Sequence, residues 1–428
     1  MSQAQDIQKL SNLLAKNDYK KLLKESEKFI SKYPNLFEGY NFLSLSNRLL
    51  GNNSEAEKIL TNIIENNQNV PEFIYHSLGH LYIHLSRFKE AHQQVKNAIN
   101  INPKYGEAYH SLGFILQELG YFGESLMAYN MSYDMTKDKN SVLAMADIYR
   151  KISSYPEAIK YYEKVSGPRS DMNILEAHYY LGNSKIFNDK LLSQNVKRPL
   201  LPLIACLSAH SAIRYTQKDN YPYCPDPMDY ISVYQITEKD GFTDKLIKDI
   251  LSLLEKNKVD FKAQSLLHNG TQSAGDIFAM SDPSVDKIKK IIEKKIIEYR
   301  KFHQNENIGL FNEWPKDNEC NLKGWIIKLK KGGQLSPHIH KEGWVSGSLY
   351  FKIPKKNKTN EGDIKFSLNG ANYPTDGKFY FEKIVSLKDG VMVLFPSSVF
   401  HSTIPFESNE DRITFAFDII PNHMYNHE

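Results

Sequence analysis

The stretch "GGQLSPHIHKEGWVSGSLYF", residues 332–351, changes character half-way along its length. Its first half is polar and carries two histidines one residue apart, and its second half alternates in the manner of a β-strand. Side chains at positions i and i+2 of an extended segment point to the same side, so His338 and His340 could face one ion together. Imidazole suits iron, zinc, copper and nickel. A histidine pair is also common in plain polar turns, so the rest of the chain decides between these interpretations.

Short alternating runs around this stretch predict a β domain. The runs are "GWIIKLK" (324–330), "SGSLYFKIP" (346–354), "DIKFSL" (363–368), "FYFEKIVSL" (379–387), "GVMVLFP" (390–396) and "RITFAFDII" (412–420). Turn-rich segments such as "KKNKTNEGD" and "NGANYPTDGK" separate them. Many short strands with little helix between them predict a sandwich or barrel-like β fold.

Two further residues of this region have the chemistry of a binding site. His401 follows the apolar run that ends at Pro396, and Arg412 opens the last run eleven residues later. An arginine on a strand that faces a β interior needs an anionic partner, because it cannot lose its charge. Thr414 lies on the same face as Arg412, and a guanidinium with a hydroxyl suits a carboxylate. The alternative is that the histidines are ordinary polar residues and that the arginine pairs with Glu410, Asp411 or Asp418.

The order of the histidines and the arginine along this region resembles the pattern of the iron(II)- and 2-oxoglutarate-dependent oxygenases. The stretches "HIHKEGWVSGSLYFKIP" and "LFPSSVFHSTIPFESNEDRITFAFDIIP" are similar to a bacterial and phage branch of that family, often found behind tetratricopeptide repeats. The resemblance covers about residues 225–423. It implies a double-stranded β-helix (jelly roll), iron(II), 2-oxoglutarate as cosubstrate and O2. It also implies that His338, His340 and His401 bind the metal, and that Arg412 with Thr414 grips the far carboxylate of 2-oxoglutarate.

The second metal ligand departs from the family pattern, H-x-D/E…H, because position 340 is histidine. We favour a three-histidine site, which keeps the usual spacing to the following strand. The alternative triad is His340, Glu342 and His401, which restores a carboxylate. A third alternative is that two histidines bind and water fills the gap.

Cupins share the β-helix and offer a competing interpretation. Gly332 precedes His338 by six residues, and Gly390, Pro396 and His401 have the second cupin spacing. The usual cupin glutamate is missing, however, and cupin chemistry gives no reason for Arg412. A different class of interpretation is a non-catalytic scaffold whose β domain has lost activity, for which the missing carboxylate is the best support.

The N-terminal part contains an internal repeat. "YHSLGHLYIHLSRFKEAHQQVKNAININP" starts at Tyr75, and "YHSLGFILQELGYFGESLMAYNMSYDM" starts 34 residues later at Tyr109. Small residues at Gly79 and Gly113 let paired helices approach closely, and such pairs must stack to bury their apolar faces. This resembles tetratricopeptide repeats, which implies recognition of a peptide or protein. The alternative is that the array forms a homodimer or only supports the next domain.

These patterns predict three parts: helical repeats over residues 1–187, a proline-rich linker or packing segment over 188–235, and the β domain over 236–428. Two helices, over 242–257 and 282–302, are expected to flank the β domain. The formal net charge of +4 gives no case for nucleic acid. Three scattered cysteines, a polar N-terminus and no apolar run of about 18 residues predict a cytoplasmic protein without a membrane segment.

The fold class expected is therefore a multidomain α + β protein, with a helical solenoid followed by a jelly roll. The function expected is an oxygenase that hydroxylates a C–H bond of a protein or peptide recruited by the repeats.

Overall fold

The computed structural model describes residues 2–194, 200–255, 261–262, 266–273, 275–280 and 282–422. The chain forms two compact units. The first contains Met1–Ile152, Ser252–Lys262 and Ser273–Met280, and the second contains Ser153–Leu251, Ala263–Gln272 and Ser281–Glu428. Part of the predicted linker, residues 195–199, and the end of the predicted β domain, residues 423–428, lie outside the described residues. The predicted boundaries at residues 187 and 235 stay predictions.

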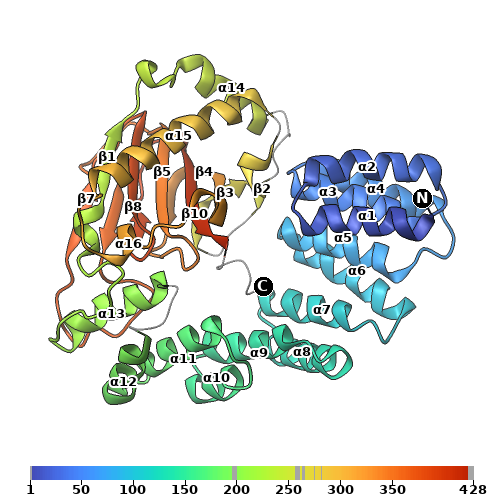
Figure 1. Ribbon diagram of the computed structural model, residues 1–428, viewed down its shortest axis with the longest axis horizontal. Helices are drawn as coiled ribbons and strands as arrows, with labels where there is room; N and C mark the ends of the chain where they lie inside the picture. The colour runs from blue at the N-terminus through green and yellow to red at the C-terminus, as the bar shows by residue number, and fades with distance from the viewer. Residues whose placement is uncertain are drawn as a thin grey trace. The chain divides into compact units, whose positions relative to one another are not determined.

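Paired helices build the first unit, drawn in blue and cyan in Figure 1. They are α1 (Gln3–Ala15), α2 (Tyr19–Lys32), α3 (Phe37–Leu49), α4 (Asn53–Asn66), α5 (Glu72–His84), α6 (Phe88–Ile101), α7 (Gly106–Glu118), α8 (Phe122–Thr136) and α9 (Lys139–Lys151). The first helix of each pair starts 33 to 35 residues after the one before it, at residues 3, 37, 72, 106 and 139. The helical repeat predicted from the 34-residue period is confirmed.

The glycines that were predicted to let paired helices approach lie where those helices touch. A methyl group on Gly79 of α5 would lie 2.8 Å from Val95 Cγ2 of α6. One on Gly113 of α7 would lie 2.8 Å from the ring of Tyr129 of α8, which is the residue 34 positions after Val95. These distances are shorter than carbon atoms tolerate, so each glycine sets the closeness of its helix pair.

The second unit begins with four more helices. They are α10 (Tyr155–Tyr162), α11 (Pro168–Tyr180), α12 (Ser184–Gln194) and α13 (Pro202–Arg214). The last of these lies inside the segment predicted as a linker or packing segment, and most of its residues are buried. The helices predicted beside the β domain are α14 (Asp244–Glu255) and α15 (Pro283–Phe302), followed by the short α16 (Gly309–Asn312). Thr243 Oγ1 accepts a hydrogen bond from Leu246 N and so caps the start of α14.

The strands of the second unit form two sheets. They are β1 (Ser232–Gln235), β3 (Leu267–Ser273), β4 (Cys320–Leu335), β5 (Val345–Lys352), β6 (Ile364–Ser367), β7 (Glu382–Val385), β8 (Val391–Pro396), β9 (Phe400–Thr403) and β10 (Arg412–Pro421). The larger sheet of this unit has the order β1-β8-β5-β10-β4-β3, and the smaller sheet has the order β7-β6-β9. The short β2 (Phe261–Lys262) belongs to the first unit. Figure 1 shows α15 crossing one face of the larger sheet.

A single apolar cluster joins the two sheets. It contains Tyr350 of β5 and Val393 of β8 from the larger sheet, together with Ile364 and Phe366 of β6 from the smaller one. The sheets therefore pack against each other through these side chains. The predicted fold class is confirmed, because stacked helix pairs are followed along the chain by an antiparallel β domain of two packed sheets. No helix among the described residues has the length and apolar character to cross a bilayer.

Candidate metal centre

The three predicted histidines come together at one end of the β domain. His338 and His340 lie on the loop between β4 and β5, and His401 lies on β9. Backbone hydrogen bonds run both ways between His338 and His401, with N–O distances of 3.0 and 3.1 Å. His340 N donates to Ser397 O at 3.1 Å, which fixes the loop against the end of β8. The backbone thus places the histidines although more than sixty residues separate them in sequence.

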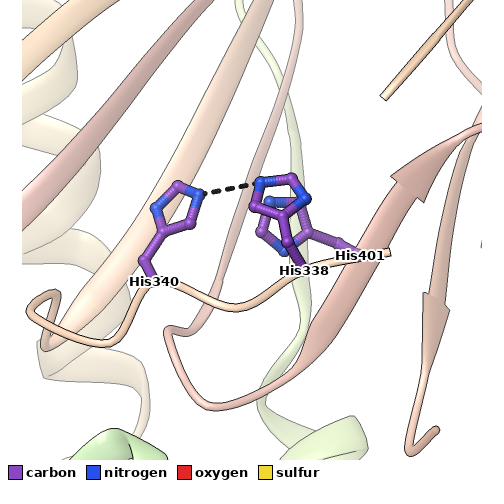
Figure 2. Close-up of side chains that lie close together, drawn as sticks. All are labelled: His338, His340 and His401. Carbon is purple, nitrogen blue, oxygen red and sulfur yellow. Dashed lines mark hydrogen bonds between the residues drawn. The ribbon is translucent and has the colours of Figure 1, made fainter. Parts of the chain in front are cut away.

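Figure 2 shows the three imidazole rings turned toward one another. One nitrogen from each ring lies within 4.8 Å of the other two, which is a spacing that one metal ion could bridge. The Nε2 atoms of His338 and His340 lie 3.3 Å apart. Glu342, the alternative second ligand, is exposed and does not belong to this group.

A hydrogen-bond acceptor lies beside the Nδ1 atom of each ring. His338 Nδ1 lies 2.8 Å from Ser336 O, and His401 Nδ1 lies 3.3 Å from Val399 O. His340 Nδ1 lies 2.6 Å from Asp418 Oδ1. Each acceptor favours a proton on Nδ1, which leaves Nε2 with a free lone pair for a metal. The donor set therefore fits a metal ion of the kind that imidazole binds.

Burial keeps two of these rings neutral. It lowers the pKa of His338 to about 4, with a smaller contribution from the neighbouring His340. Burial also lowers the pKa of His401 well below its usual value. A neutral imidazole is the form that binds a metal, so these two rings need not lose protons near neutral pH to bind one.

The predicted anion-binding residues lie on β10. Arg412 is 3 % exposed and Thr414 is 2 % exposed. The arginine donates from Nη1 to Thr414 Oγ1 at 2.8 Å and from Nε to Gly362 O at 2.9 Å. Its guanidinium carbon lies 4.9 Å from the ring centre of Tyr350 on β5. These contacts hold the guanidinium in place.

The carboxylates that the sequence offered as ion-pair partners of Arg412 are engaged elsewhere. Asp411 pairs with Lys328 at 2.9 Å, Glu410 accepts from Lys355 N at 3.0 Å, and Asp418 contacts His340. Within the described part of the chain, no ion pair of 4.0 Å or less joins Arg412 to a carboxylate. A buried cation without such a partner is costly unless an anion binds to it.

One cavity of about 300 Å³ contains both groups of residues. The histidine cluster and Glu342 line it, and so do Arg412 and Thr414. From Arg412 to Asp418, every second residue of β10 reaches it, namely Arg412, Thr414, Ala416 and Asp418. The period of two therefore puts Arg412 on the same strand face as Asp418, which contacts His340.

Asp418 is the residue whose role the sequence interpretation missed. It was considered only as an ion-pair partner for the arginine, whereas the structure places it against His340. The signal was present in the alternation of β10, because Asp418 lies six residues after Arg412 and so shares its face.

Comparison with protein families agrees with this geometry. Residues 323–418 match the family described as "Putative 2OG-Fe(II) oxygenase". Residues 74–105 match the tetratricopeptide repeat family. The matched oxygenase segment contains all three histidines, Arg412 and Asp418. No curated protein matches the sequence.

Solved structures similar to the chain include several repeat proteins. One is a tetratricopeptide repeat protein from Parabacteroides merdae, with 15% identity and a TM-score of 0.41. The match covers 59% of this chain and 98% of the chain from Parabacteroides merdae. Another is PilF of Pseudomonas aeruginosa, with 14% identity and a TM-score of 0.39. The match covers 45% of this chain and 90% of the PilF chain.

Proposed function

We propose that the protein is an iron(II)- and 2-oxoglutarate-dependent dioxygenase that hydroxylates a C–H bond of a protein or peptide. The observation that carries this proposal is the pairing of two features in one cavity. A three-histidine cluster lines one part of this cavity, and Arg412 lines another part; this buried arginine forms no ion pair of 4.0 Å or less with a carboxylate of the described residues. A metal site alone would not need that arginine.

The three Nε2 atoms of His338, His340 and His401 would hold iron(II). Bound iron(II), with 2-oxoglutarate and O2, supplies the oxidation: the substrate C–H becomes C–OH, and 2-oxoglutarate leaves as succinate and CO2. The hydrogen bonds at Nδ1 orient the rings and keep the three Nε2 atoms directed at the iron site.

Arg412 and Thr414 would bind the far carboxylate of 2-oxoglutarate. A guanidinium presents paired donors that match a carboxylate, and the hydroxyl adds a third. The site is already organised, because Gly362 O and the ring of Tyr350 fix the guanidinium. Apolar residues in the wall, including Ile327, Leu335 and Ile364, exclude water and strengthen this attraction.

The helical repeats support a protein or peptide as the substrate. Residues 74–105 match the tetratricopeptide repeat family, and stacked helix pairs present extended concave surfaces that suit a peptide. The substrate's chemistry beyond that class is a matter for direct identification, for instance by mass spectrometry of captured peptides.

The test uses the intact protein without oxygen. Iron(II) and 2-oxoglutarate together should give a weak visible charge-transfer band, and His401→Ala should abolish it. Arg412→Ala should keep metal binding and raise the 2-oxoglutarate concentration needed for the band about 10- to 100-fold. The reason is that hydrogen bonds to charged groups contribute about 1.5–3 kcal/mol, and 1.4 kcal/mol is tenfold.

Two outcomes would overturn the proposal. If wild-type protein gives no band, and no succinate when air and cell extract are added, the β domain is a scaffold. If Arg412→Ala leaves both the band and the activity unchanged, the three histidines belong to a cupin-type enzyme that does not use 2-oxoglutarate.

A further inference from the structure

Asp418 lies at the metal end of β10 and is almost fully buried. It is 6 % exposed and lies directly opposite Ser346 in the pairing of β10 with β5. It shares the cavity face of β10 with Arg412, Thr414 and Ala416. A carboxylate in this position has lost its water and must be compensated by hydrogen bonds and by positive charge.

Its hydrogen bonds lead to the metal ligand. Oδ1 of Asp418 accepts from His340 Nδ1 at 2.6 Å and from Ser346 Oγ at 2.7 Å. Ser346 Oγ also lies 2.7 Å from Ser397 Oγ, whose backbone carbonyl accepts from His340 N. Two serines therefore hold the carboxylate and the histidine loop together.

The described residues give Asp418 no ion pair with a lysine or arginine, although Lys323 lies opposite it in the pairing of β10 with β4. The one ion-pair contact that the described residues give Asp418 is to His340, and neither lysine nor arginine lies within 4.0 Å. A buried carboxylate without a cation is unfavourable on its own. A divalent ion on the far nitrogen of His340 would supply the charge through the ring.

Close approach of the loop depends on Gly343. A methyl group at this position would lie 2.6 Å from Ser397 Oγ and 3.3 Å from Asp418 Cγ. Any larger side chain would push the loop away from Asp418. The sequence thus makes room for a tight contact between the histidine loop and this carboxylate.

Among the three histidines, only His340 has an anionic group, the carboxylate of Asp418, beside its Nδ1 atom. The Nδ1 atoms of His338 and His401 face neutral backbone carbonyls. His340 is also the position at which the wider family pattern has an aspartate or glutamate ligand. The negative charge absent from the ligand position is therefore present one hydrogen bond further out.

We propose that Asp418 is the positioning carboxylate of the metal centre. It holds His340 with its proton on Nδ1 and its lone pair on Nε2, and it supplies the negative charge that a carboxylate ligand would otherwise bring. This inference rests on the metal site of the proposed function and deepens it. A carboxylate behind a metal-bound histidine orients the ring and raises its basicity.

The first test measures metal affinity of the full-length apo-protein with cobalt(II), whose ligand-field absorption reports binding without turnover. Asp418→Asn should weaken cobalt(II) binding about 10- to 100-fold, which is the usual cost of losing such a partner. Asp219→Asn is the matched control, because this carboxylate also accepts from a serine, Ser208, but away from the cavity lining. The control should bind cobalt(II) as the wild type does.

A double-mutant cycle distinguishes electrostatics from simple structural support. In a His340→Asp background the ligand itself is a carboxylate, and Asp418 becomes a second negative charge beside it. There, Asp418→Asn should leave cobalt(II) affinity unchanged or increase it. An equal loss in both backgrounds would overturn the proposal.

A third measurement needs no variant and therefore covers a failure of Asp418→Asn to fold. Long-range proton–nitrogen NMR spectra of the histidine rings in the apo-protein should show the His340 proton on Nδ1. A proton on Nε2 would overturn the proposal. If the wild type binds no cobalt(II), the proposed metal site and this inference both fall. If it binds and Asp418→Asn binds equally well, this inference alone falls.

Discussion

At the scale of the residue, the centre depends on which nitrogen of each histidine is free. Backbone carbonyls and Asp418 take the three Nδ1 protons, so the ring orientation is set by groups that are not ligands. Glu342 differs from the histidines in its surroundings. It lines the same cavity, but it is exposed and lies outside the histidine cluster. The sequence spacing allowed either His340 or Glu342 as the second metal ligand, and the hydrogen bonds favour His340.

Substitutions at these two positions should therefore differ. Glu342→Ala should change cobalt(II) affinity by less than about twofold, because Glu342 is exposed and lies outside the histidine cluster. His340→Ala should reduce it by more than 100-fold, because one of three ligands is lost. The measurement is a cobalt(II) titration followed by absorption. Comparable losses for both variants would point to the alternative triad of His340, Glu342 and His401.

At the scale of the element, β10 organises the whole site. It pairs with β4 on one side and β5 on the other, and all ten of its residues are buried. Such a strand cannot slip by one residue without turning its polar face away from the cavity. The pairing of Thr414 with Tyr350 and of Asp418 with Ser346 then fixes both ends of the cavity at once.

The helix pairs of the first unit have their own sensitive element, the close contact of α7 and α8. Gly113→Val should lower the free energy of unfolding by about 1–3 kcal/mol, because Tyr129 is buried and blocks the added atoms. Gly123→Ala on α8 is the control, since its methyl group meets nothing within 4 Å. The control should be neutral or slightly stabilising.

Urea unfolding of the full chain, followed by far-ultraviolet circular dichroism, provides the measurement for this pair. A loss at Gly123 as large as that at Gly113 would show that the contact with Tyr129 is not the cause.

At the scale of the whole molecule, stability should depend on pH through buried histidines outside the metal centre. His210 of α13 is fully buried and contacts Tyr179 and Asn369. Burial lowers the pKa of His210 to about 4, and nearby Arg214 lowers it further, whereas Asn369 and Asp376 oppose the shift. The unfolded chain, with a histidine pKa of about 6.5, therefore binds this proton more readily than the folded chain.

The sign follows directly from this difference. The stability that neutral His210 provides is fully present above pH 6.5, and it is lost progressively as pH falls from about 6.5 to about 4. For one such site the slope approaches about 1.4 kcal/mol per pH unit. In metal-free protein, His210→Gln should reduce the slope measured by urea unfolding across this range. Equal slopes for wild type and His210→Gln would contradict this assignment.

Much of this molecule could be predicted from its sequence. The period of 34 predicts the helix pairs, and the six alternating runs predict β4, β5, β6, β7, β8 and β10, because both patterns arise within a single element. The strands β1, β3 and β9 were not predicted. Asp418 could not be assigned in the same way. Its partner His340 lies 78 residues earlier, and the sequence does not say which strand lies beside the histidine loop. The helix α13 was not predicted, since the prolines of residues 188–235 suggested a linker or packing segment.

The most direct test of the central claim is a crystal structure of the protein grown anaerobically with cobalt(II) and 2-oxoglutarate. The account predicts one metal ion on the Nε2 atoms of His338, His340 and His401, with the keto acid end of 2-oxoglutarate on the metal and its far carboxylate on Arg412 and Thr414. A metal ion held by Glu342, or a 2-oxoglutarate that does not reach Arg412, would contradict it.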